Sequence, residues 1–215
     1  MTLVKVCGLR SLSDAQAAVT AGANLLGFIF WKPGKRYIPP ADAAVILRAL
    51  RSQSSGWSAV GVFVDPSLAE VTEATSACGL DYVQLSGEET ADFVRAVPRP
   101  ALKAVHVKNG EERAAADLVL NDALGAHLYL LDTHADGLPG GTGATFDWPA
   151  LQPIGPKCLV AGGLRPDNVA AALTALSPLG VDVSSGVEFP NSGGKDPRLI
   201  RAFLEAVRTY DKRPH

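Results

Sequence analysis

Two short segments near opposite ends of the chain contain residue types that suit chemistry on an anionic small molecule. Residues 181–188 (VDVSSGVE) form an apolar, β-branched run that breaks into two serines and a glycine. Small residues at a strand end expose backbone N–H groups, and such groups followed by a helix start favour a bound anion such as phosphate. Residues 160–164 (VAGGL) repeat the pattern of a strand followed by glycines. We therefore predict a phosphate site that both turns form together.

The other segment, residues 5–8 (KVCG), places a single thiol at the expected end of a first strand. Alternation along this strand puts Lys5 and Cys7 on one face and Val6 on the other. In barrel enzymes, the inward face at the carboxyl ends of the strands carries the catalytic groups. Because a buried cysteine is also a common inert core residue, both interpretations of Cys7 stay open from this segment alone.

An acidic residue and a basic loop are further candidates. Asp132 ends an apolar strand-like run, where a carboxylate is costly unless it is solvated, paired or used. A carboxyl group in a partly closed site can have a raised pKa and act as a general acid; capping of the following loop is the alternative. Arg36 lies in a loop with two lysines, and its planar guanidinium suits a carboxylate. A solvated surface loop is the other interpretation of Arg36.

Strand alternation also places polar side chains inside the predicted barrel. Lys5 and Asp182 face inward on strands that become neighbours when a barrel closes. We therefore expect a buried ion pair between them, since neither charge is stable there alone. Gln84 and Ser86 alternate inward on another strand and can hydrogen-bond the hydroxyl groups of a substrate.

The histidines form no ligand pattern. His106, His127 and His134 fall on one strand, at the start of the next and in a long loop. Because zinc ligands usually occur at short paired spacings, we expect no metal site. We interpret these three histidines as structural or surface groups.

Eight β-type runs position these residues, and most are nearly continuous in Val, Ile and Leu, as is typical of parallel strands covered on their outer face. The runs occupy residues 3–7, 25–30, 59–64, 82–85, 102–107, 128–132, 158–161 and 181–183. Helical segments alternate with them at 13–21, 41–51, 67–78, 88–97, 111–118, 166–176 and 197–210, with a weak one at 148–151. Ser13 and Ser67 are predicted helix N-caps, and Gly22 and Gly79 are predicted helix ends.

This alternation predicts an α/β fold: a single (β/α)8 TIM barrel across residues 1–215, with a phosphate site at the ends of strands 7 and 8. A doubly wound open sheet is the alternative, but eight units without a Pro- or Gly-rich linker favour closure. Loops at 31–40 and 133–145 follow the second and sixth strands. Loops of this length in a compact barrel are usually functional.

Composition and charge limit the binding partners and the cellular compartment that we expect. The chain is 47% hydrophobic and 20% charged with a formal net charge of −2, so neither nucleic acid nor an anionic membrane is expected as a partner. Three cysteines without CxxC spacing favour a reducing compartment. The start of the chain has no signal-peptide pattern, and the most apolar run is far too short to span a bilayer. We expect a cytoplasmic protein.

Nine short motifs follow one another in a specific order. They are KVCGLR (5–10), GFIF (27–30), KRY (35–37), VGVF (60–63), VQLSG (83–87), LLDT (130–133), GGTGATFDW (140–148), AGGLRPDNV (161–169) and VDVSSGVE (181–188). Through them the chain, from Lys5 to the final helix, resembles the phosphoribosylanthranilate isomerase family of tryptophan biosynthesis. KVCG, GGTG-FDW and VDVSSGVE are highly specific in combination, although each alone is not.

The resemblance implies an Amadori rearrangement of N-(5-phosphoribosyl)anthranilate to 1-(2-carboxyphenylamino)-1-deoxyribulose 5-phosphate, without a cofactor or metal. Asp132 would be the general acid that protonates the ribose ring oxygen, and Cys7 the general base that removes the C2′ proton. Arg36 would hold the anthranilate carboxylate. The phosphate would bind backbone donors of Gly162, Gly163, Ser184, Ser185 and Gly186, with the loop that contains Gly141 and Gly143 closing nearby.

One departure from the family pattern and two alternatives remain. The family commonly has His where this chain has Ser86, and a hydroxyl cannot carry charge, which puts a proton-relay or electrostatic role there in doubt. Another phosphosugar isomerase, of the histidine-pathway type or a dual-substrate barrel, is the first alternative; Asp is expected in those barrels where Cys7 stands here. A non-catalytic phosphosugar-binding barrel is the second. Barrels of this size form monomers or dimers, and we favour the monomer.

Overall fold

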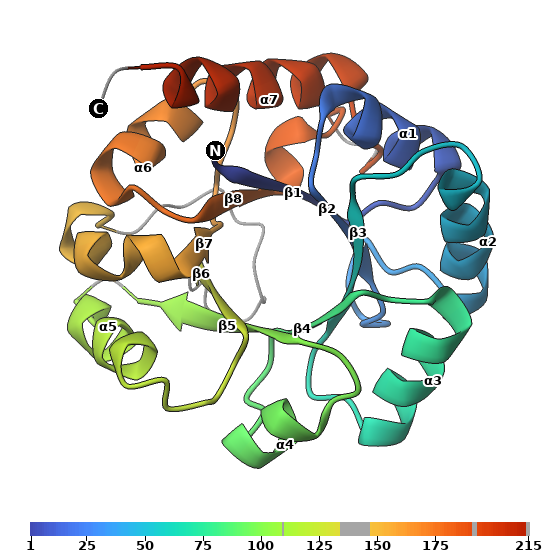
Figure 1. The fold of residues 1–215 in the computed structure, drawn as a ribbon, viewed down its shortest axis with the longest axis horizontal. Coiled ribbons are helices and arrows are strands. Elements are labelled where there is room, and N and C mark those ends of the chain that lie inside the picture. The colour runs from blue at the N-terminus through green and yellow to red at the C-terminus, as the bar shows by residue number, and fades with distance from the viewer. Residues whose placement is uncertain (109, 134–146, 191–192, 214–215) are drawn as a thin grey trace.

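The computed structural model describes residues 1–108, 110–133, 147–190 and 193–213. Eight parallel strands pair in chain order, and the eighth pairs with the first, so the sheet closes into a barrel (Figure 1). The strands are β1 (Leu3–Cys7), β2 (Leu25–Ile29), β3 (Ser58–Phe63), β4 (Tyr82–Leu85), β5 (Ala101–Val107), β6 (Leu128–Thr133), β7 (Cys158–Val160) and β8 (Gly180–Val183). The predicted TIM barrel is confirmed, and each predicted strand lies within one residue of its observed bounds.

Helices surround the ring of strands (Figure 1). They are α1 (Leu12–Ala21), α2 (Pro40–Arg51), α3 (Leu68–Cys78), α4 (Ala91–Ala96), α5 (Glu112–Leu120), the 3-10 segment η1 (Pro149–Lys157), α6 (Val169–Leu176), the short 3-10 turn η2 (Ser185–Val187) and α7 (Pro197–Asp211). Apolar side chains of these helices pack on the outer faces of the strands, while a smaller apolar cluster fills the inside of the barrel. No helix among the described residues combines the length and apolar character needed to cross a bilayer.

Helix ends confirm three predicted signals and correct one. Ser67 caps α3 in a reciprocal capping box with Glu70, and Gly22 and Gly79 end their helices in the left-handed conformation. The prediction of Ser13 as a cap was wrong. The N-cap of α1 is Ser11, which has an extended backbone and accepts the backbone N–H of Asp14.

Three predicted helices have different bounds. The helix predicted at 88–97 begins only at Ala91, because Thr90 is its N-cap and accepts the N–H of Phe93. The helix predicted at 166–176 begins at Val169. The weak segment at 148–151 extends to Lys157 as a 3-10 helix. Its internal prolines, Pro153 and Pro156, lack the N–H that an α-helix needs at those positions.

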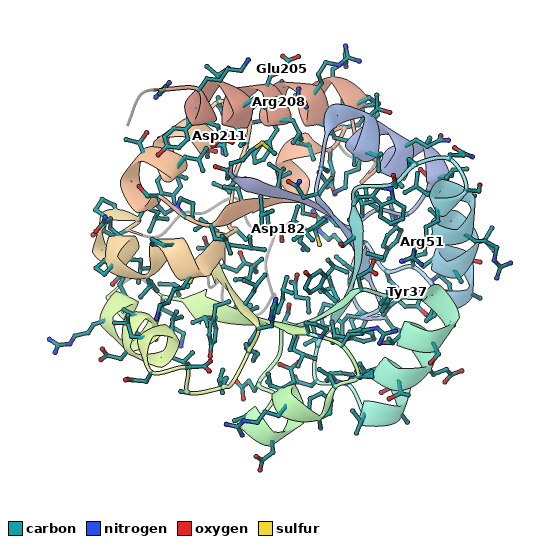
Figure 2. The ribbon with its side chains drawn as sticks, in the orientation of Figure 1. Tyr37, Arg51, Asp182, Glu205, Arg208 and Asp211 are labelled. Carbon is teal, nitrogen blue, oxygen red and sulfur yellow. The ribbon has the colours of Figure 1, made fainter. Side chains whose placement is uncertain are left out.

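The predicted ion pair lies inside the barrel. Lys5 and Asp182 are register partners on β1 and β8, and their side chains meet at 2.8 Å from Nζ to Oδ2. Lys5 is fully buried and Asp182 is 8% exposed. Figure 2 shows Asp182 within the ring of strands, whereas charged side chains of α7 such as Glu205 lie on the outer rim. The pair therefore joins the two strands that close the barrel.

Asp182→Ala is expected to lower the free energy of unfolding by about 3–5 kcal/mol, because the Lys5 ammonium would stay buried without its counter-ion. Urea unfolding monitored by circular dichroism measures this change. Asp92→Ala is the matched control, since Asp92 pairs with Arg95 in full contact with solvent and such pairs contribute little. Equal, small losses in both variants would show that the buried pair does not hold β1 to β8.

Candidate active site

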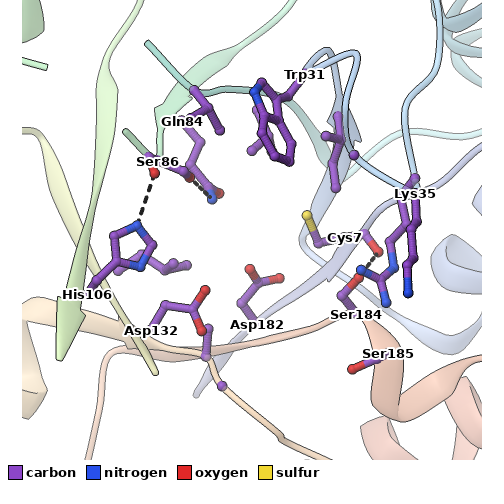
Figure 3. Close-up of a pocket in the computed structure, with 18 of the residues that line it drawn as sticks. Cys7, Trp31, Lys35, Gln84, Ser86, His106, Asp132, Asp182, Ser184 and Ser185 are labelled. Atoms are coloured by element: carbon purple, nitrogen blue, oxygen red, sulfur yellow. Dashed lines mark hydrogen bonds between the residues drawn. The ribbon is translucent and has the colours of Figure 1, made fainter. Parts of the chain in front are cut away.

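A cavity of about 270 Å³ opens at the carboxyl ends of the strands (Figure 3). It contains most of the residues that the sequence singled out, on loops and strand ends far apart in the chain. The predicted residues in its lining are Cys7, Arg36, Gln84, Ser86, Asp132, Gly162, Gly163, Ser184 and Ser185. Gly141 and Gly143 lie outside the described residues. The structure adds Trp31, Lys35, His106 and Asp182 to the lining.

Asp132 is the second-last residue of β6 and lines the cavity. Its Oδ1 accepts the backbone N–H of Thr133 at 2.8 Å. Burial raises the pKa of Asp132 to about 6; the nearby Asp182 carboxylate acts in the same direction, while His106 lowers it. A carboxyl group with this pKa is partly protonated near neutral pH, as a general acid requires.

Cys7 ends β1 and is buried, with its thiol in the cavity lining. Its register partner on β2 is Gly27, and a Cβ at that glycine would lie 2.7 Å from the sulfur. Only glycine therefore leaves room for the thiol. Burial raises the pKa of Cys7 above its ordinary value, and the ammonium of Lys5 acts in the opposite direction without cancelling the effect. Cys7 is therefore a neutral thiol at neutral pH.

Arg36 is held by an acid that the sequence analysis did not single out. Its Nε and one terminal nitrogen donate to the two carboxylate oxygens of Glu188 at 2.6 and 3.0 Å. Lys195, fully buried, donates to the same carboxylate at 2.9 Å. These donors hold the pKa of Glu188 below its usual range, although burial acts in the opposite direction. The only sequence signal for this role is the position of Glu188 at the end of VDVSSGVE.

The turns after β7 and β8 present backbone donors, as predicted. Gly162 and Gly163 both have positive φ angles, at 85° and 62°, which favour glycine. Among the described residues, no acceptor bonds the backbone N–H groups of Gly163 and Ser185. Ser184 is fixed by a hydrogen bond from its hydroxyl to the Cys7 carbonyl, at 3.1 Å.

Gly186, the remaining predicted donor, is not among the residues that line the cavity. A Cβ there would collide with the carbonyl oxygen of Leu164, so this glycine lets the turn after β8 pack against the turn after β7. Its backbone N–H stays a predicted phosphate donor.

Two residues of the cavity lining, Gln84 and Asp182, each have a buried oxygen without a partner in the described part of the chain. Gln84 donates from Nε2 to the Ser86 hydroxyl at 3.1 Å. Its Oε1 and the Oδ1 of Asp182 are buried and have no hydrogen-bond partner among the described residues. Buried oxygens of this kind are costly. A substrate hydroxyl in the cavity would reach either oxygen only after the side chain rotates.

His106, interpreted from the sequence as a structural or surface group, is located at the cavity. This side chain lines the cavity, with Nε2 3.0 Å from the Ser86 carbonyl oxygen. His127 is exposed, as expected, and His134 lies outside the described residues. Among the described residues, no three His, Cys, Asp or Glu side chains are grouped to hold a metal ion.

A closed eight-stranded barrel with a carboxyl group, a thiol and two anion-binding turns around one cavity defines the chain as a TIM-barrel enzyme of the acid–base type. The family model described as N-(5'phosphoribosyl)anthranilate (PRA) isomerase matches residues 4–206. The chain belongs to this PRA isomerase family.

Individual relatives and solved structures of the PRA isomerase family are similar to this chain over nearly its whole length. N-(5'-phosphoribosyl)anthranilate isomerase of Citrifermentans bemidjiense is 44% identical over 211 residues, which cover 97% of this chain and 98% of that protein. The enzyme of Pseudomonas fluorescens strain Pf-5 is 43% identical over 205 residues, covering 95% and 94%. The crystal structure of the Thermotoga maritima enzyme is 35% identical with a TM-score of 0.84, covering 97% of this chain and 100% of that one.

A further solved PRA isomerase is described in complex with reduced 1-(o-carboxyphenylamino)-1-deoxyribulose 5-phosphate. It is 33% identical to this chain, with a TM-score of 0.81 and coverage of 97% of this chain and 100% of that one. That protein therefore binds a phosphorylated analogue of the expected product in the same fold.

Proposed function

We propose that the chain isomerises N-(5'-phosphoribosyl)anthranilate to 1-(2-carboxyphenylamino)-1-deoxyribulose 5-phosphate in tryptophan biosynthesis. Membership of the PRA isomerase family supports this reaction. The observation that carries it is the placement of Asp132 and Cys7 on opposite sides of one cavity, with Asp182 between them (Figure 3). An acid and a base on two sides of a sugar are what ring opening followed by proton removal needs.

In this mechanism, Asp132 gives its proton to the ribose ring oxygen, and the ring opens to a protonated Schiff base. With a pKa of about 6, roughly a tenth of the Asp132 side chains are protonated at pH 7. The raised pKa also keeps the carboxyl group a better acid catalyst near neutral pH than one with an ordinary value.

Cys7 then removes the C2′ proton, and the resulting enolamine tautomerises to the ketone. Burial keeps Cys7 a thiol at neutral pH, but the reactive form is the thiolate, so the thiol first loses its proton to solvent. The positive charge of the protonated Schiff base favours the anionic sulfur next to it. Ring opening thus prepares the base for the following step.

The remaining residues bind the substrate. Arg36, already oriented by Glu188, receives the anthranilate carboxylate, and Gln84 and Ser86 hydrogen-bond sugar hydroxyls. The phosphate binds the turns after β7 and β8, with direct donors from Gly162, Gly163, Ser184 and Ser185. Gly186 supports these turns by packing, and phosphate contacts of Gly186, Gly141 and Gly143 remain predictions.

The direct test is an isomerase assay with phosphoribosylanthranilate generated in situ, in which loss of its anthranilate-type fluorescence is followed. Fast decay that is absent in Cys7→Ala supports both the reaction and its base. A folded chain that binds the reduced product analogue without turnover would instead support a non-catalytic phosphosugar-binding barrel. Turnover of another phosphosugar alone would indicate a different isomerase.

The pH profile of kcat/KM is expected to fall below about pH 6 and to be level above it until Cys7 titrates. The productive form pairs protonated Asp132 with the Cys7 thiolate. Between the pKa of Asp132 and that of Cys7, a rise in pH lowers the protonated fraction of Asp132 by the same factor by which it raises the thiolate fraction of Cys7. Below the Asp132 pKa of about 6, only the thiolate still changes, so the rate falls.

Initial rates at low substrate concentration from about pH 4 to 9.5 measure this profile. The substrate phosphate also titrates near pH 6, so the residual rate of Asp132→Asn is the control. Without the acid, this rate should rise with pH as Cys7 ionises, with no level region, and any step near pH 6 belongs to the phosphate. Direct titration of the Asp132 carboxyl carbon by NMR assigns the group. A profile that stays level down to about pH 4 would contradict the raised pKa.

We further propose a single-domain, cytoplasmic monomer. The three cysteines are free and buried, which suits a reducing compartment. The exposed large apolar side chains of the described residues are scattered over separate elements, namely Met1, Val45, Leu68, Leu120 and Phe189. The Thermotoga maritima relative is described as dimeric, and light scattering distinguishes the two states.

A further inference from the structure

We propose that His106 is a positioning residue for Asp132, with a ring that is anchored on the backbone of β4 and orients the general acid. The inference rests on the proposed function, because it assigns Asp132 as that acid. His106 extends from β5 and Asp132 from β6, and the two residues are register partners. Side chains of register partners lie on the same face of the sheet, here the inner face at the mouth of the cavity.

The anchor determines which ring nitrogen carries a proton. Nε2 of His106 lies 3.0 Å from the Ser86 carbonyl oxygen, and a carbonyl oxygen only accepts hydrogen bonds. Nε2 therefore carries a proton. Nδ1 lies on the other side of the ring, and only the imidazolium form, in which Nδ1 also carries a proton, can donate to the Asp132 carboxylate and lower its pKa. Figure 3 shows the ring between Ser86 and Asp132, with its second nitrogen on the side of Asp132.

A buried lysine makes this anchor rigid. Lys103 donates to the carbonyl oxygens of Leu85 and Gly87, at 3.4 and 2.7 Å, on either side of Ser86. It also pairs with Glu89 at 3.0 Å, and both side chains are almost completely buried. Glu89 in turn accepts the backbone N–H of Gly87. The backbone around Ser86 is thereby held, and its carbonyl oxygen is directed toward His106.

Asp132 has one hydrogen bond to its carboxyl group among the described contacts, so its orientation also depends on its neighbours. One oxygen accepts the N–H of Thr133, and the described contacts include no second hydrogen bond to this carboxyl group. The charged groups that act on it are His106 from β5, Asp182 from β8 and Lys5 from β1. Of these, His106 is the neighbour on the adjacent strand, so its ring is placed to restrict the carboxyl rotation.

The arrangement also bears on the departure at Ser86. His106 contacts the backbone carbonyl oxygen of Ser86 and not its hydroxyl. The imidazole on this wall of the cavity thus comes from β5, whereas the residue at the end of β4 contributes only a hydroxyl and the anchoring oxygen.

The test compares His106→Ala, His106→Gln and His106→Asn with the parent chain. His106→Ala is expected to lower kcat about 10- to 100-fold, as misplacement of a catalytic group by about 1 Å does, with KM changed less than about threefold. Since His106 lowers the pKa of Asp132, its removal should move the acid limb of kcat/KM to higher pH. His127→Ala is the control, because His127 is exposed and lies at the other end of the barrel. It should change neither kcat nor the acid limb of kcat/KM.

The two amide variants separate positioning from a structural role. Glutamine can keep the hydrogen bond to Ser86 but has no group at the Nδ1 position, so it should be as slow as alanine. Asparagine has its amide near the Nδ1 position and should recover part of kcat. A glutamine variant faster than the asparagine variant would overturn the inference. An acid limb of kcat/KM that does not shift in any of the three variants would also overturn it, as would a kcat of His106→Ala equal to that of the parent.

Two checks keep the outcome interpretable. If His106→Ala does not fold by circular dichroism, the two amide variants carry the comparison. The pKa of the Asp132 carboxyl measured by NMR needs no turnover. A higher pKa in the His106 variants supports the contact even if the parent has no PRA isomerase activity, which would refute the proposed function separately. An unchanged pKa would overturn the inference.

Discussion

Replacing Asp132 with asparagine is expected to lower kcat by at least about 10²–10⁴-fold, because the amide has no acidic proton for the ribose ring oxygen. Asparagine has nearly the same shape and can still accept the N–H of Thr133. Burial raises the folded-state pKa of Asp132 to about 6, so the ionised carboxylate destabilises the fold above that pH. The neutral variant should therefore be no less stable than the parent at neutral pH.

Steady-state kinetics and urea unfolding on the same preparation measure both effects. Asp132→Glu is the matched variant, since it keeps the acidic proton but displaces it by one methylene, and it should retain more activity than the amide. A near-normal kcat in Asp132→Asn would show that another group protonates the ring oxygen. Lost activity together with a lower free energy of unfolding would indicate a structural role for the carboxylate.

Cys7→Ala is expected to cause a loss of similar size, about 10²–10⁴-fold in kcat, because no other group described at the cavity replaces the sulfur next to Gly27. Cys7→Ser should also be slow, since a hydroxyl ionises far less readily than a thiol. Binding of the substrate should change much less than kcat in both variants, because the base acts only after ring opening. Single-turnover kinetics separate the two steps.

The two other cysteines are matched controls for this experiment. Burial raises the pKa of Cys78 to about 11 and that of Cys158 to about 12, and neither residue lines the cavity. Alanine at either position should leave kcat unchanged, although each removes a buried sulfur. If Cys7→Ala behaves like these two variants, the sulfur is a packing residue and the base lies elsewhere.

Several features of the site were predictable because they depend on local periodicity. Strands buried on both sides are almost continuously apolar, so the eight runs could be found with errors of one residue at most. Alternation along β1 and β8 then predicted that Lys5 and Asp182 face inward, and barrel closure makes them partners. The same rule placed Cys7 and Asp132 at the cavity.

Other features depended on contacts between distant segments. The role of Glu188 as the support of Arg36 joins residues 152 positions apart, and no local pattern predicts that bond. The contact of His106 with the Ser86 carbonyl oxygen also joins distant positions. The close packing of Gly186 against Leu164 is a further contact that its motif does not predict.

The number and order of the strands and the barrel class could be predicted from residue order alone, since strand period is a local property, and the family resemblance then singled out Asp132 and Cys7. Tertiary structure alone decided which side chains support them. The pKa of Asp132, the orientation of Arg36 and the place of His106 follow from burial and from strand register. Burial and register arise only when the sheet closes and distant side chains share one low-dielectric cavity.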